Sequence, residues 1–198
     1  GYKAYWEDGA QVTAPKDKEI ITEGQAISDY HTVKTMEKAE AMAAGLYQVI
    51  GAEIDDAYMV ELKKQVIHPE IIKEVAEDIK IVYTPLCGTG NEPVREVLGR
   101  LGVNIAVVGC QEKPDGDFKT CEYPNPETDA ALNESYKVAK NVPCDVILGT
   151  DPDCDRVGIA VRDNGEYKLM TGNEVGALLL NYLLERKAES GTLPKDPV

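Results

Sequence analysis

The sequence lacks several features that mark common classes of binding protein. Basic residues are few: 21 Lys and Arg stand against 35 Asp and Glu, which gives a net charge of −14. A surface of that sign repels phosphate backbones and anionic lipids, so we expect no nucleic-acid partner and no membrane partner. Aromatic residues make up only 6% of the chain, and they suggest no platform on which bases would stack.

Long apolar runs and paired cysteines are also missing. No stretch approaches the roughly 20 apolar residues of a membrane span, and the first residues do not form a signal peptide pattern. The 5 cysteines are odd in number, scattered, and never spaced as Cys-x-x-Cys. This spacing argues against a disulfide framework or a zinc site and predicts free thiols in the reducing cytoplasm.

The composition is otherwise that of a globular protein. Of the 198 residues, 43% are hydrophobic and 28% are charged, which suffices for a core in one or two domains. Residues 1–51 have thin, poorly periodic apolar content, with a strand-like start at residues 3–6 and two helical stretches. Because the sequence begins without Met and stops soon after a helix-like segment, we expect a piece of a longer protein.

The middle of the chain alternates between helical and strand patterns. Helices are predicted over residues 55–66 and 69–76, and strands over 79–83 and 103–108. Between the strands, a helix begins near Pro93 and ends before Gly102. A strand–helix–strand unit of this kind predicts parallel pairing through a right-handed crossover.

The second half continues the alternation and then adds a hairpin. Asn125 is predicted to be the N-cap of a helix that runs to about Lys140. A strand, a two-stranded hairpin and a capping box before a last helix are predicted at residues 145–148, 157–170 and 171–174. The predicted fold class is α/β, with a mixed sheet that is parallel at its centre and antiparallel at one edge.

One short loop has the chemistry of a cation site. Asp151, Asp153 and Asp155 alternate along residues 151–156 (DPDCDR), directly after a predicted buried strand, where parallel sheets collect ligands. Carboxylates this close repel one another unless a cation lies among them, and such hard oxygen ligands suit Mg²⁺ or Ca²⁺. Arg156 beside them is suited to binding a phosphate. The alternative is a solvated acidic loop that only connects two strands.

An EF-hand does not explain this loop. Counted from Asp151, that motif needs glycine at its sixth position and glutamate at its twelfth, where this sequence has Arg156 and Arg162. Mg²⁺ completed by water and a substrate phosphate fits the three short carboxylates better.

Other candidate residues are weaker. The glycine loop 84–91 lacks the third glycine of a dinucleotide fingerprint, and tight turning from strand to helix explains it without a ligand. His31 and His68 are isolated and are interpreted as surface or packing residues. Cys154 lies among carboxylates, which would raise the pKa of its thiol and argue against a nucleophilic role.

Several of these segments together resemble the α-D-phosphohexomutases, the phosphoglucomutase/phosphomannomutase family. Residues 151–158 (DPDCDRVG) resemble the family's metal-binding loop, and residues 84–90 (TPLCGTG) its TPxHGxG turn. Residues 124–127 (PNPE) and 172–174 (GNE) are similar to further family segments, in the family's order. Residues 1–11 (GYKAYWEDGAQ) are similar to the segment just downstream of the family's active-site serine loop.

The resemblance implies a fold, a mechanism and roles for particular residues. The fold would be a three-layer α/β/α domain with a mixed, mainly parallel sheet, as in the family's second domain. A phosphoserine elsewhere in the protein would exchange a phosphoryl group with a hexose phosphate through a hexose bisphosphate. Asp151, Asp153 and Asp155 would bind Mg²⁺, Arg156 would contact the phosphoserine phosphate, and Lys3 would assist proton transfer at the reacting hydroxyl.

The resemblance also implies that parts of the protein lie outside this chain. Residues 1–54 would be the end of domain I, residues 55–168 domain II, and residues 169–198 the start of domain III. The serine loop, the sugar-binding loop and domain IV would lie in the rest of the protein, so we expect this chain alone to be inactive. The parent is predicted to be a phosphoglucomutase. A phosphomannomutase or phosphopentomutase of the same family, or a non-catalytic module that binds metal or phosphate, are the alternatives.

Overall fold

The chain folds into two compact units. The computed structural model describes residues 3–194, so Gly1 and Tyr2 of the N-terminal segment that resembles the family, and residues 195–198, lie outside the described part. The units are Gly1–Ile50 and Gly51–Val198.

The first unit is small and has little core. Its elements are helix α1 (Lys16–Gln25), a 3-10 turn (Tyr30–Thr32) and helix α2 (Lys38–Ala43). None of the residues of these three elements is buried. The strand predicted over residues 3–6 is reduced to a single antiparallel bridge between Tyr5 and Gln11. The thin apolar content of this segment therefore corresponds to a unit without a sizeable interior.

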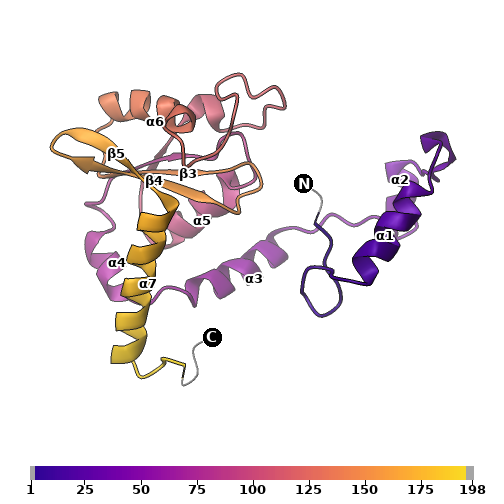
Figure 1. Cartoon of the computed structure of the whole chain (residues 1–198), viewed down its shortest axis with the longest axis horizontal. Helices are drawn as coiled ribbons and strands as arrows, with labels where there is room; N and C mark the ends of the chain where they lie inside the picture. Colours follow the sequence, from indigo (N-terminus) through magenta and orange to yellow (C-terminus); the bar gives the residue numbers. More distant parts are fainter. Residues whose placement is uncertain (1–2, 195–198) are drawn as a thin grey trace. The chain divides into compact units, whose positions relative to one another are not determined.

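The second unit is built on a five-stranded sheet (Figure 1). Its helices are α3 (Ala52–Lys63), α4 (Pro69–Val75), α5 (Asn91–Arg100), α6 (Asp129–Asn141) and α7 (Gly172–Glu189). Its strands are β1 (Ile81–Thr84), β2 (Ile105–Val107), β3 (Val146–Thr150), β4 (Val157–Asp163) and β5 (Glu166–Met170), and a 3-10 turn (Gly109–Gln111) comes after β2. The strand order is β2-β1-β3-β4-β5. β1 pairs in parallel with β2 and β3, whereas β4 pairs antiparallel with β3 and β5, as the sequence predicts.

Two hydrophobic clusters cover opposite faces of this sheet and make three layers. On one face, Val82 and Ile147 pack with Leu132 and Ala139 of α6. On the other face, the cluster around Ile81 is covered by residues of α4 and α5. The faces alternate because successive residues of a strand point to opposite sides. Figure 1 shows α6 and α5 on opposite sides of the strands. The predicted α/β/α fold class is confirmed.

Two predicted helices are displaced: the helix predicted over residues 55–66 is α3, three residues earlier, and α6 begins later than predicted. The sequence predicts Asn125 as the N-cap of α6, but the helix begins at Asp129 and its N-cap is Thr128, whose hydroxyl accepts the N–H of Ala131. The reason is packing: Pro126 is almost fully buried against the sheet, so it holds this stretch of chain outside the helix.

The local signals after β3 are confirmed. Asn164 and Gly165 have positive φ angles of 50° and 89° between β4 and β5, as a type I′ turn requires. At the start of α7, Thr171 and Glu174 form a reciprocal capping box. Turn and cap chemistry depend on neighbouring residues alone, so the sequence predicts both.

The capping box leads to a prediction about pH. Glu174 Oε2 accepts the backbone N–H of Thr171 at 2.8 Å and its hydroxyl at 3.0 Å, and these bonds hold the pKa of Glu174 below its usual range. A lowered carboxyl pKa means that the box stabilises the fold above the unfolded pKa and is lost as pH falls through the folded pKa. In a carbon-13 NMR titration, Glu174 should have a midpoint below that of an ordinary glutamate, and Thr171→Ala should raise it towards the ordinary value. An unchanged midpoint in the variant would contradict the assignment.

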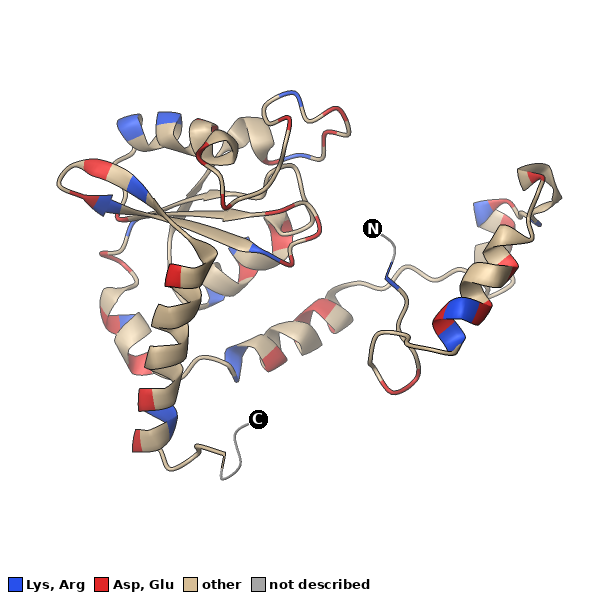
Figure 2. Cartoon of the chain, in the orientation of Figure 1, with Lys and Arg blue, Asp and Glu red and all other residues tan. Residues whose placement is uncertain are grey.

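The charges are spread over both units. Figure 2 shows acidic residues along the helices and the loops rather than gathered at one place. Among the described residues, no helix is both long enough and apolar enough to cross a membrane.

Candidate functional site

The acidic loop, residues 151–156, is folded around one buried carboxylate. Asp151 follows β3 directly and is only 2% exposed. Its Oδ1 accepts the backbone N–H groups of Asp155 at 3.0 Å and Arg156 at 2.9 Å, and its carbonyl accepts the N–H of Cys154 at 2.9 Å. The side chain of Asp151 therefore organises the backbone of the whole loop.

This turn brings the three predicted carboxylates together. One oxygen from each of Asp151, Asp153 and Asp155 lies within 4.8 Å of the other two. Burial raises the pKa of Asp151; the N–H of Arg156 opposes the rise, and the charges of the other two carboxylates add to it. In the part of the chain that the structure describes, this is the only group of three acidic, His or Cys side chains that could hold a metal ion. Three clustered hard oxygen donors are a donor set that fits Mg²⁺ or Ca²⁺.

Arg156 lies at the rim of this cluster. Its Nε is 3.3 Å from Asp151 Oδ2 and 3.8 Å from Asp155 Oδ1. Half of its side chain is nevertheless exposed. The contact with Asp151 orients the guanidinium, and the exposed part can meet an anionic group from solvent.

The topology explains why a site lies here. β1 and β3 are neighbours and parallel, yet the chain leaves β1 through α5 on one face and enters β3 from α6 on the other. The place where the connections change from one face of a sheet to the other is called a topological switch point. Open α/β sheets bind ligands there, at the carboxyl ends of the strands. The acidic loop comes after β3 and the glycine loop after β1, so two of the segments identified in the sequence meet at this point.

The glycine loop, residues 84–91, lies in direct contact with the acidic loop. The N–H and the hydroxyl of Thr89 both donate to the carbonyl of Pro152, at 3.0 and 3.2 Å. A methyl group added at Gly88 would lie 2.4 Å from Pro152 Cα. The turn itself puts its positive φ angles on Leu86 (46°) and Cys87 (60°). Tight turning therefore does not explain these glycines; the closeness of the other loop does.

Pro126 of the 124–127 segment packs against the two strands, β3 and β4, that the acidic loop connects. Gly149 of β3 and Gly158 of β4 are cross-strand partners, and together they leave room for Pro126. A methyl group at Gly158 would lie 1.9 Å from the carbonyl oxygen of Pro126. The glycine loop thus contacts the acidic loop directly, and Pro126 contacts the strands that lead into it and out of it.

Lys3 belongs to the first unit. Its side chain is exposed, and with Asp17 and Ile20 it helps to line a hollow of about 270 Å³. Asp151, Asp153, Asp155 and Arg156 belong to the second unit. The role of Lys3 stays a prediction.

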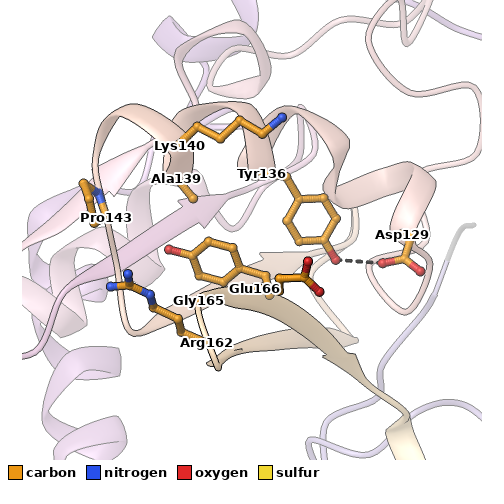
Figure 3. A pocket seen from close by; sticks show the side chains of 9 residues that line it. Asp129, Tyr136, Ala139, Lys140, Pro143, Arg162, Gly165 and Glu166 are labelled. Atoms are coloured by element: carbon orange, nitrogen blue, oxygen red, sulfur yellow. Dashed lines mark hydrogen bonds between the residues drawn. The ribbon is translucent and has the colours of Figure 1, made fainter.

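A second hollow, of about 430 Å³, lies between α6 and the β4–β5 hairpin (Figure 3). Tyr136 and Tyr167 both line it, and the centroids of their rings are 6.3 Å apart. The sequence pattern does not predict this hollow. Both hydroxyls are used within the fold: Tyr136 donates to Asp129 at 2.8 Å, and Tyr167 donates to the carbonyl of Cys144 at 2.9 Å. The lining of the hollow shares no residue with the acidic loop.

Comparison with known proteins agrees with this arrangement. Residues 56–165 match the family description "Phosphoglucomutase/phosphomannomutase, alpha/beta/alpha domain II". The chain therefore belongs to the phosphoglucomutase/phosphomannomutase family, and the matched part is its domain II. The family resemblance of the sequence is confirmed.

Relatives with several functions share this similarity. A phosphopentomutase of Mus musculus is 35% identical over 90% of this chain, which covers 29% of the relative. A probable phosphomannomutase of Haemophilus influenzae is 35% identical over 98% of the chain, 39% of the relative. A phosphoglucomutase of Staphylococcus epidermidis is 30% identical over 94% of the chain, 33% of the relative. The chain thus spans between about three and four tenths of the length of these relatives.

Proposed function

We propose that Asp151, Asp153 and Asp155 bind one Mg²⁺ ion in a phosphoglucomutase that interconverts α-D-glucose 1-phosphate and 6-phosphate. The observation that carries this proposal is the acidic loop itself, which gathers three carboxylate oxygens within 4.8 Å around the buried Asp151. The position at the switch point and the phosphomutases among the relatives support it.

Each residue then has a role in phosphoryl transfer. The bound ion would neutralise negative charge on the transferring phosphoryl group, which is the main requirement of this chemistry. Arg156, oriented by Asp151, would bind the phosphate of a phosphoserine through its exposed guanidinium. Lys3 would move a proton at the hydroxyl that receives or releases the phosphoryl group.

We also propose how the chain fits into a longer protein. Residues 1–54 would end domain I, residues 55–168 would form domain II, and residues 169–198 would begin domain III. The greater length of the relatives supports a longer protein, and the domain II match over residues 56–165 supports the middle part of this division. The rest of domains I and III, and domain IV, would bring the serine and the sugar and phosphate contacts, so the chain alone is expected to have no mutase activity.

The relatives are named for different sugar phosphates. Identity to the phosphopentomutase and the probable phosphomannomutase is 35%, against 30% for the phosphoglucomutase, so these two activities are the alternatives within the family. A module that binds metal or phosphate without catalysis is the alternative outside it.

Turnover by the complete protein tests these alternatives. Glucose 1-phosphate, mannose 1-phosphate and ribose 1-phosphate would be compared at equal concentration with Mg²⁺ present. We expect the fastest turnover with glucose 1-phosphate. Faster turnover of one of the other two sugars would reassign the substrate, and metal binding without turnover of any sugar would favour the non-catalytic module.

A further inference from the structure

A pair of buried hydroxyls lies beneath the acidic loop. Tyr83 of β1 is fully buried, and Thr150, the last residue of β3, is 7% exposed. Their side-chain oxygens share a hydrogen bond of 2.8 Å. Thr150 immediately precedes Asp151 in the chain. The hydroxyl pair therefore connects β1 to the residue before the acidic loop.

The thiol of Cys154 completes this arrangement from inside the loop. A methyl group at Gly90 would lie 2.6 Å from Thr150 Oγ1, 2.7 Å from the Tyr83 hydroxyl and 2.8 Å from Cys154 Sγ. The three side chains therefore converge on one point beside the N-cap of α5. Cys154 also has a positive φ of 58°, which a non-glycine residue rarely adopts. The side chain of Cys154 lies beside Gly90 of the glycine loop, on the same side as the two hydroxyls.

We propose that Tyr83 and Thr150 are positioning residues of the acidic loop. Their hydroxyl pair supports Cys154 and thereby holds residues 151–155 in the turn in which the three carboxylates can share one divalent cation. The inference rests on the proposed function, because it concerns affinity for the cation. Neither hydroxyl belongs to the three carboxylates, so the effect would be indirect.

The physical reason is preorganisation. Without a cation the three carboxylates repel one another, and a loop free to spread would have to be reordered each time a cation binds. A support anchored in β1 removes part of that cost. Burial raises the pKa of Tyr83 to about 12, so its hydroxyl keeps its proton across the physiological range and the hydrogen bond persists.

The test is the affinity of this chain for Mn²⁺, followed by the electron paramagnetic resonance signal of the free ion. Tyr83→Phe and Thr150→Val each remove one hydroxyl, and we expect each to raise the Kd for Mn²⁺ by about three- to tenfold. Because both variants break the same bond, the double variant should bind little more weakly than either single one. Thr150→Ser keeps the hydroxyl and should keep the affinity.

Tyr167→Phe is the matched control. Its hydroxyl also forms hydrogen bonds, partly buried ones to the backbone of Cys144, at a place that shares no residue with the acidic loop. We expect this variant to lower the melting temperature without a change in the Kd for Mn²⁺. If Tyr83→Phe and Thr150→Val behaved in the same way as Tyr167→Phe, the positioning role would be wrong and the metal site would stand. If the unmodified chain bound no Mn²⁺ at millimolar concentration, the proposed metal site would fail, and this inference with it.

Discussion

Replacing Asp153 by asparagine in the complete protein is expected to lower Mg²⁺-dependent phosphomutase turnover at least about 100-fold. The amide has nearly the same shape but no negative charge, so the cluster would lose one of the three carboxylates that hold the cation. The bound cation neutralises negative charge on the phosphoryl group during transfer. Catalysis of this reaction consists mostly of positioning and charge neutralisation, so loss of the cation should lower turnover strongly.

Asp163→Asn is the control for this variant. Asp163 is an exposed residue at the end of β4, and its substitution changes the net charge by the same amount. Turnover of the control should stay within about twofold of the unmodified protein, since a lone surface charge contributes little. Near-normal turnover of Asp153→Asn would show that this carboxylate does not hold the cation.

The second large effect is expected at Gly158, where alanine should destabilise the second unit by about 3 kcal/mol. The added methyl group would lie 1.9 Å from the Pro126 carbonyl oxygen and 2.9 Å from its Cβ. Because the first of these atoms belongs to the backbone, no side-chain rotation relieves the clash. Pro126 would have to move away from the sheet, and its packing against β3 and β4 would be lost.

Gly99→Ala is the matched control for that substitution. Gly99 lies within α5, and a methyl group there would meet no atom within 4 Å. Alanine in a helix interior is more favourable than glycine by about 0.5–1 kcal/mol, so this variant should be slightly more stable. Urea unfolding followed by circular dichroism measures both variants. Equal stability of Gly158→Ala and the unmodified chain would contradict the observed packing of Pro126.

The features that the sequence predicts correctly have local causes. The position of α5 between β1 and β2, the Asn164-Gly165 turn and the capping box at Thr171 depend on signals within a few residues, and all three are present. The acidic loop is recognisable because three carboxylates alternate directly after an apolar strand. In each case the physical cause lies within the local sequence.

The features that the sequence could not provide depend on contacts between distant residues. Gly149 and Gly158 give room for Pro126 only because β3 and β4 pair in one particular register. The same burial of Pro126 moves the N-cap of α6 from Asn125 to Thr128. Likewise, Gly88 approaches Pro152 of a different loop, and a sequence pattern alone cannot distinguish that close approach from the requirement of a local turn.

Mn²⁺ binding to this chain tests most directly whether the acidic loop is a divalent-cation site. A titration of the unmodified chain and of Asp151→Asn, with Asp163→Asn as the charge-matched control, separates a specific site from the general attraction of an acidic protein. We predict one bound Mn²⁺ per chain in the unmodified protein and in Asp163→Asn, and a Kd raised at least about tenfold in Asp151→Asn. Equal binding by all three chains, or no binding by any of them, would contradict the assignment of the acidic loop as a metal site.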